Sequence, residues 1–196
     1  YLAVDGVYAG YVILNDIVKK ESRIMVVGLK ELGVKTCMLT GDKKEGAASV
    51  ATSLGLDECH SELLPDDKRK LLQEKISAKS GYVAYVGDGI NDAPSITLAD
   101  VGVAMGGAGS DLAVENADVV IMNDDPSKIV DAIKIAKKTK AKAVTNIVVA
   151  LVVKLAIMML SIFLPGFPLL AAVLADTGLT VLLVVNSLLL LNVKKL

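Results

Sequence analysis

The chain of 196 residues has no tryptophan, few aromatic residues (4%) and almost no net charge, with 21 Lys and Arg against 22 Asp and Glu. A nucleic-acid-binding protein needs aromatic side chains to stack on bases or a basic surface to bind phosphates. The composition therefore excludes nucleic-acid binding. Two cysteines, Cys37 and Cys59, are too few for a disulfide framework and do not form a CxxC metal motif. The single histidine, His60, excludes a histidine-rich metal site built from this chain alone.

Hydrophobic residues make up 53% of the sequence, and residues 147–196 contain only four charged residues. The apolar runs Ile147–Leu164 and Phe167–Leu191 would form helices of about 27 and 37 Å, against a hydrocarbon core of about 30 Å. Pro165-Gly166-Phe167-Pro168 marks a turn where the first run ends. The sequence therefore predicts a charged domain over residues 1–145 and a transmembrane hairpin over residues 146–196, with helices at about 147–164 and 167–191.

Lysines flank the predicted hairpin on both sides. Six of them lie between residues 128 and 142, and Lys194 and Lys195 follow the second apolar run. The positive-inside rule then predicts a multi-pass protein of the cell (plasma) membrane, with residues 1–145 and the C-terminus in the cytoplasm. We interpret these lysines as a membrane anchor rather than a regulatory lipid site. Since the chain starts at Tyr1 without a signal pattern, we expect it to be part of a longer protein.

Apolar runs and segments of helical spacing alternate through residues 1–145. The expected strands are Val7–Leu14, Val34–Leu39, Tyr82–Val86, Val101–Met105 and Val119–Met122. The expected helices are Lys19–Leu32, Lys43–Leu54, Pro65–Lys79 and Pro126–Thr145, the last running without a hinge into the membrane. This alternation predicts an α/β fold, a parallel sheet with helices on both faces.

Two of the predicted strands end in loops with phosphate- and metal-binding chemistry. Thr40-Gly41-Asp42 offers a hydroxyl and backbone N–H groups, which are donors to a phosphate. The loop of residues 87–92, Gly-Asp-Gly-Ile-Asn-Asp, offers carboxylate oxygens, which are the ligands that Mg²⁺ prefers. Lys68, near the start of the intervening helix, adds a cation. Together these groups predict phosphoryl transfer.

Three segments resemble the phosphorylation domain of P-type ATPases, a branch of the haloacid dehalogenase-like superfamily. They are MLTGD (Met38–Asp42), LLPDDK (Leu63–Lys68) and VGDGINDAP (Val86–Pro94). The resemblance covers essentially the whole chain. It implies part of a Rossmann-like parallel sheet followed by the last two membrane helices, with Mg²⁺ as cofactor and ATP as substrate of the full-length protein.

The resemblance also implies roles for residues of the first two segments. Thr40 would hydrogen-bond the phosphoryl group, and Lys68 would neutralise its developing charge. Gly41 would let the backbone approach closely, and Asp42 would belong to the same catalytic loop.

Residues of the third segment would form the magnesium loop. Asp88 would ligate Mg²⁺, while Asn91 and Asp92 would hold the loop and the phosphate in place. Gly87 and Gly89 would let the backbone approach the bound phosphate closely.

Two charged residues stand near the middle of the apolar runs: Lys154 in Asn146–Leu160 and Asp176 in LADTG (Leu174–Gly178). This pairing resembles the branch of heavy-metal P-type ATPases that exports zinc, cadmium or lead. The Tyr-Asn and Met-x-x-Ser-Ser motifs expected of the copper branch are absent, as is the His-Glu-Gly motif of the cobalt-type branch.

A charge at the bilayer centre costs about 2.5–3.5 kcal/mol on insertion scales, so these two residues need a reason to be there. We therefore expect Asp176 to be a ligand of the transported divalent cation and Lys154 to be the counter-charge of the empty site. The alternative is a purely structural ion pair.

Other motifs have structural interpretations. We expect Cys37 to be a small core residue of a buried strand, and Cys59-His60 to lie in a surface loop. Asp42, Asp66 and Asp67 are possible helix caps, an interpretation compatible with a functional role. The glycines of residues 106–109 favour a turn before a helix over a phosphate cradle.

The sequence lacks the DKTGT motif whose aspartate P-type ATPases phosphorylate, and it also lacks the TGE loop and the Cys-Pro-Cys helix. We therefore expect this chain to need the missing N-terminal domains of the same pump and to be inactive alone. Two rival functions are a membrane-anchored dehalogenase-like phosphatase and an inactive membrane protein. A phosphatase needs a nucleophilic aspartate after its first strand, but Asp5-Gly6 has the pattern of a hairpin turn.

Overall fold

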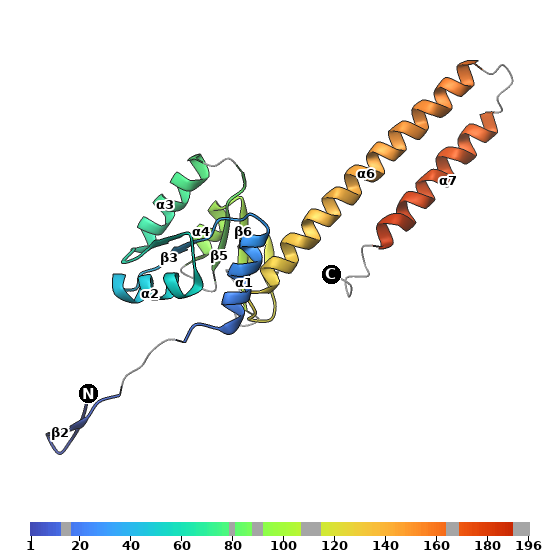
Figure 1. Ribbon diagram of the computed structural model, residues 1–196. Helices are drawn as coiled ribbons and strands as arrows, with labels where there is room; N and C mark the ends of the chain where they lie inside the picture. Colours follow the sequence, from blue (N-terminus) through green and yellow to red (C-terminus); the bar gives the residue numbers. More distant parts are fainter. Residues whose placement is uncertain (13–16, 79–80, 88–91, 107–114, 164–168, 190–196) are drawn as a thin grey trace. The chain divides into compact units, whose positions relative to one another are not determined.

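The computed structural model describes residues 1–12, 17–78, 81–87, 92–106, 115–163 and 169–189 (Figure 1). The chain divides into two compact units, Tyr1–Ile129 and Val130–Leu196. The domain boundary expected near residue 145 stays a prediction.

The first unit begins with a β-hairpin of β1 (Leu2–Val4) and β2 (Val7–Gly10), which pair antiparallel. Asp5 and Gly6 join the strands with φ values of 52° and 79°. Positive φ at both central residues is the geometry of a two-residue hairpin turn, so the turn prediction for Asp5-Gly6 is confirmed. β2 ends at Gly10, before the Leu14 expected from the sequence, and residues 13–16 lie outside the described part.

The next strands, β3 (Cys37–Leu39) and β4 (Glu58–His60), form a parallel pair. Helices α1 (Lys20–Glu31), α2 (Lys44–Leu54) and α3 (Pro65–Ala78) accompany them, each within a few residues of its predicted range. α2 ends at Gly55, whose φ of 71° is the left-handed cap that glycine adopts without strain.

A second parallel sheet has the order β5 (Ala84–Gly87), β6 (Val101–Met105), β7 (Val119–Ile121). Helix α4 (Ala93–Leu98) packs on β6, where Ile96 and Ala104 are fully buried. A Cβ at Gly102 would lie 2.4 Å from the Ile96 carbonyl oxygen, so this close packing requires glycine. The α/β class with parallel strands is confirmed, although the strands form two sheets rather than one.

An acidic residue closes the amino end of each parallel pair. In every case the aspartate precedes one strand and accepts a backbone N–H from the start of its neighbour. The three bonds are Thr36 N to Asp57 at 2.7 Å, Val83 N to Asp100 at 2.8 Å and Gly102 N to Asp118 at 2.8 Å. The Thr36 backbone and hydroxyl, which both donate to Asp57, hold the pKa of that carboxyl below its usual range.

Two expectations about the cysteines are wrong. Cys37 lies in a strand, but it is exposed rather than a core residue. Cys59 and His60 lie in β4 rather than in a surface loop. The segment Glu58–His60 has no apolar run, and pairing with β3 rather than its own pattern makes it a strand.

The second unit contains α7 (Leu169–Leu188) and nearly all of α6 (Lys128–Phe163), which is continuous through Asn146. By length and composition α6 can span a membrane, while Ala175–Leu188 in α7 is a shorter apolar segment. The helices run antiparallel (Figure 1), and polar side chains join them. Asn146 donates to Ser187 at 2.8 Å and accepts from Asn186 at 2.7 Å. The predicted turn of residues 165–168 lies outside the described residues.

Candidate functional site

The loop after β3 is held by hydrogen bonds to the last residue of β4 and to the segment that follows it. The Thr40 N–H donates to the His60 carbonyl at 3.0 Å, and the Thr40 carbonyl accepts from Leu63 N at 3.1 Å. A Cβ at Gly41 would lie 3.3 Å from the Leu63 carbonyl oxygen, so the chain itself packs closely against this glycine. The Thr40 hydroxyl donates to Asp42 Oδ2 at 2.7 Å. These bonds present the hydroxyl at the carboxyl end of β3.

Lys68 and Asp92 come together from two helices that pack against each other. Lys68 lies in α3, Asp92 immediately precedes α4, and their Nζ and Oδ1 atoms are 3.6 Å apart. The Tyr85 hydroxyl in β5 donates to the same Oδ1 at 2.9 Å. The two charged side chains are only 24% and 18% exposed, which strengthens their attraction relative to a surface pair.

Gly87 makes room for this arrangement. A Cβ there would lie 2.6 Å from Asp92 Cβ and 3.0 Å from Asp92 Oδ2. Real atoms do not approach so closely, so any larger residue would displace the aspartate from Lys68 and Tyr85.

The acidic start of α3 supports the position of Lys68. Asp67 Oδ2 accepts the Leu64 N–H at 3.2 Å, which satisfies one free donor at the start of the helix and confirms a cap. Asp66 instead lies 3.8 Å from Arg69 in an ion pair one turn along. Asp42 does not cap α2, because its carboxylate accepts from Thr40 and no side-chain cap bond is formed there.

The structure thus brings two of the predicted segments into one charged pair and joins the third to them through Leu63. Asp88, Gly89 and Asn91 lie outside the described residues, as do residues 107–109 of the glycine-rich segment. The sequence did not predict a role for Tyr85 in the site. Its position could have suggested one, because Tyr85 lies in β5, the strand that leads into the loop.

The two charges of the apolar segments form a pair. Lys154 Nζ in α6 lies 3.1 Å from Asp176 Oδ1 in α7. The side chains are 58% and 51% exposed in the protein alone. A carboxylate held by a single lysine can exchange that partner for a cation, so the geometry fits both the transport interpretation and a structural pair.

Comparison with known proteins identifies the class. Residues 2–100 match the haloacid dehalogenase-like hydrolase family, and the chain belongs to that family.

Its relatives narrow the class further, because the chain is homologous to P-type ATPases that transport zinc and cadmium. It is 48% identical to a zinc-transporting ATPase of Synechocystis sp. over 95% of this chain and 26% of that protein. It is 46% identical to a cadmium, zinc and cobalt-transporting ATPase of Bacillus subtilis over 99% of this chain and 28% of that protein.

The fold agrees with these relatives. A crystal structure of a zinc-transporting PIB-type ATPase in the E2.Pi state matches 90% of this chain and 28% of that one, with a TM-score of 0.81 and 38% identity. The chain therefore spans about a quarter of the length of the relatives it matches.

Proposed function

We propose that this chain supplies the phosphate- and magnesium-binding loops, and part of the membrane cation site, of an ATP-driven exporter of zinc, cadmium or lead. The observation that carries the proposal is the Lys68–Asp92 pair, in which two motifs distant in sequence meet beside Gly87. The homology to zinc- and cadmium-transporting ATPases supports the same assignment.

In this proposal the phosphorylated aspartate comes from a DKTGT segment outside the chain. Thr40 donates its hydroxyl to a phosphoryl oxygen, after exchanging its present acceptor, Asp42. Lys68 neutralises the charge that develops during transfer, and Asp92 keeps the ammonium in position. Tyr85 orients Asp92 through its hydroxyl.

The residues present fit a magnesium ion. Asp92 engages Lys68 and Tyr85 through Oδ1, and carboxylate oxygens are the ligands that Mg²⁺ prefers. Asp88 would hold the ion with Asp92 beside it, and the ion would neutralise phosphate charge while ATP serves as phosphoryl donor in the full-length protein.

In the membrane, Asp176 is the proposed ligand of the transported cation. Lys154 pairs with it when the cation is absent and helps to release the cation by competing for the carboxylate. The 3.1 Å contact between Lys154 Nζ and Asp176 Oδ1 supports this exchange, because the same carboxylate would bind either the ammonium or the cation. The flanking lysines support a multi-pass arrangement in the plasma membrane, with residues 1–145 and the C-terminus cytoplasmic.

A chimera tests the proposal directly. The matching quarter of the Synechocystis zinc-transporting ATPase is replaced by this chain, and ATP hydrolysis is measured with zinc, cadmium, lead and copper. We expect stimulation by the first three ions. A chimera that inserts into membranes but shows no metal-stimulated hydrolysis would contradict the proposal and favour an inactive membrane protein.

Matched variants assign the two half-sites. Lys68→Met abolishes phosphoenzyme turnover in the chimera, whereas Lys70→Met, at an exposed lysine of the same helix, leaves it unchanged. Asp176→Asn abolishes metal stimulation, whereas Thr177→Val at the next position of α7 preserves it. The chain alone remains unphosphorylated by ATP. Its phosphorylation at Asp5 would favour the phosphatase alternative, which the hairpin turn at Asp5 does not support.

A further inference from the structure

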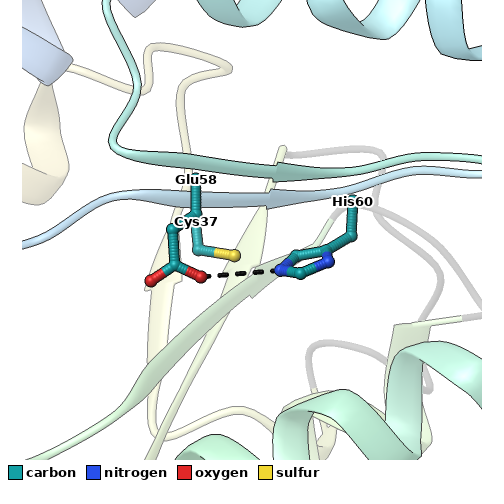
Figure 2. A group of neighbouring side chains, drawn as sticks. All are labelled: Cys37, Glu58 and His60. Atoms are coloured by element: carbon teal, nitrogen blue, oxygen red, sulfur yellow. Dashed lines mark ion pairs between the residues drawn. The ribbon is translucent and has the colours of Figure 1, made fainter.

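Three side chains with metal-ligand chemistry share one face of the β3–β4 pair. The register places Cys37 opposite Glu58 and Leu39 opposite His60. Side chains alternate along a strand, so residues 37, 58 and 60 lie on the same face, while Cys59 lies on the other. Figure 2 shows the thiol, the carboxylate and the imidazole extending to the same side of the two strands.

The ligand atoms of these three residues are already close together. One atom from each lies within 4.8 Å of the other two, and His60 Nε2 is 3.5 Å from Glu58 Oε2. Ligands of a tetrahedral zinc site are separated by roughly 3.3–3.6 Å, as the metal–ligand bond lengths require. Small side-chain rotations therefore suffice to bring all three atoms onto one ion.

The mixture of ligands selects the class of ion. Thiolate and imidazole favour zinc and the softer cadmium over magnesium or calcium, and a carboxylate completes a three-residue set with an open fourth position. The site is reachable, since Glu58 and His60 side chains are 48% and 37% exposed.

A lysine now provides the positive charge at this cluster. Lys75 Nζ in α3 is 2.6 Å from Glu58 Oε2 and also interacts with the Cys37 sulfur. The hydrogen bond from Lys75 lowers the pKa of Glu58. Lys75 is thus the competitor that an incoming cation must displace.

We propose that Cys37, Glu58 and His60 form a second binding site for a divalent ion of the zinc and cadmium class, separate from the membrane carboxylate. The site lies next to the phosphoryl loop, because the His60 carbonyl accepts the Thr40 N–H. A bound ion would join β3 to β4 just before that loop.

Binding is measured on the full chain in detergent, in the absence of ATP, with Asp176→Asn present throughout to remove the membrane carboxylate. Co²⁺ and Cd²⁺ are the probes, and thiolate-to-metal charge-transfer absorption is the signal. We expect one equivalent to bind. Cys37→Ser removes the absorption and weakens binding at least about tenfold.

Cys59→Ser is the matched control, because its thiol is adjacent in sequence but lies on the opposite face of β4. It keeps the absorption and the affinity. Equal losses in the two serine variants, or no stoichiometric binding in the parent, would overturn the site. Circular dichroism in EDTA checks folding, and His60→Gln decides the question if Cys37→Ser does not fold.

The variant Lys75→Met distinguishes the proposed site from nonspecific binding of metal to a thiol. A divalent ion replaces one proton on Cys37, so the site gains positive charge on binding, and removal of the Lys75 ammonium favours that gain. We expect several-fold tighter Cd²⁺ binding, and unchanged or weaker binding contradicts the proposal. None of these measurements depends on pump activity, so failure here and failure of the chimera are distinguishable.

Discussion

The two units use charge in opposite settings. In the first unit the Lys68–Asp92 pair lies beside a core in which Ile96 and Ala104 are fully buried. In the second unit, among the side chains that the structure describes beyond Val130, none is buried. There, polar contacts such as Lys154–Asp176 join the helices.

In the first unit, the residues of the core differ from the residues of the proposed phosphoryl site. In the second unit, the proposed cation site is also a contact between the helices. A core residue such as Ile96 packs against Gly102 and Ala104 of β6, whereas Lys68 pairs with Asp92 beside the phosphoryl loop. In the second unit the pair proposed to bind the cation also links α6 to α7. Variants in the two units should therefore behave differently, and the difference can be measured.

The largest effect is expected from Ile96→Ala. Ile96 is 1% exposed, and truncating a large aliphatic side chain in a core costs about 2–5 kcal/mol. Hydrogen exchange of the full chain in detergent should show faster exchange in β5 and β6 and unchanged exchange in α7. The control, Ile24→Ala at a residue that is 62% exposed, should leave both regions unchanged.

Asp176→Asn should affect both properties of the second unit. It leaves Lys154 without its carboxylate at membrane depth, where an uncompensated charge costs about 2.5–3.5 kcal/mol. Helix association, measured by steric trapping in bilayers, should weaken together with metal-stimulated hydrolysis in the chimera. The double variant Lys154→Met with Asp176→Leu should recover association but not hydrolysis. If it recovers neither, the pair is not what joins the helices.

Gly87→Ala should move Asp92 rather than unfold the first unit. The added Cβ overlaps Asp92, and overpacking of this kind costs about 1–3 kcal/mol. Phosphoenzyme turnover in the chimera should fall as it does in Lys68→Met. Gly46→Ala is the control, since a Cβ there meets nothing within 4 Å in α2 and should slightly stabilise the helix. Normal turnover in Gly87→Ala would show that the position of Asp92 is not critical.

Asn146→Ala should have a smaller effect on the helix pair. It removes the bonds to Ser187 and Asn186, and interhelical hydrogen bonds in membranes average about 0.6 kcal/mol. The same steric-trapping measurement should resolve this change, with hydrolysis retained. A loss as large as that of Asp176→Asn would mean that the polar contact near Asn146, rather than the ion pair, holds the hairpin.

The sequence predicted the elements whose pattern is local. The apolar run Val101–Met105 is β6 with the same bounds, Gly55 ends α2, and Asp5-Gly6 forms the hairpin turn. Each of these depends on residues within one strand, one helix end or one turn, so no long-range contact is needed to predict it.

The parts that the sequence did not predict depend on long-range pairing. β4 is three polar or small residues that become a strand beside β3, and Cys37 is exposed because of which face it occupies. The contact of Lys68 with Asp92 follows from the packing of α3 on α4. A motif indicates that Lys68 and Asp92 belong to a functional site. The two residues are 24 positions apart in the sequence, so only the tertiary structure gives the distance between them.

The smallest effect is expected where α6 begins. Asp125 accepts from the Ser127 hydroxyl at 2.6 Å and from the Ser127 N–H at 2.9 Å, and the hydroxyl above all holds its pKa below the usual aspartate range. The lowered pKa means that its stabilisation is complete above the unfolded value of about 3.9 and is lost as the pH falls through the folded value. Asp125→Asn should therefore destabilise the start of α6 slightly at pH 7 and flatten the stability profile below about pH 4. Hydrogen exchange and acid titration of both forms measure this, and identical profiles would show that the bonds from Ser127 do not stabilise the helix.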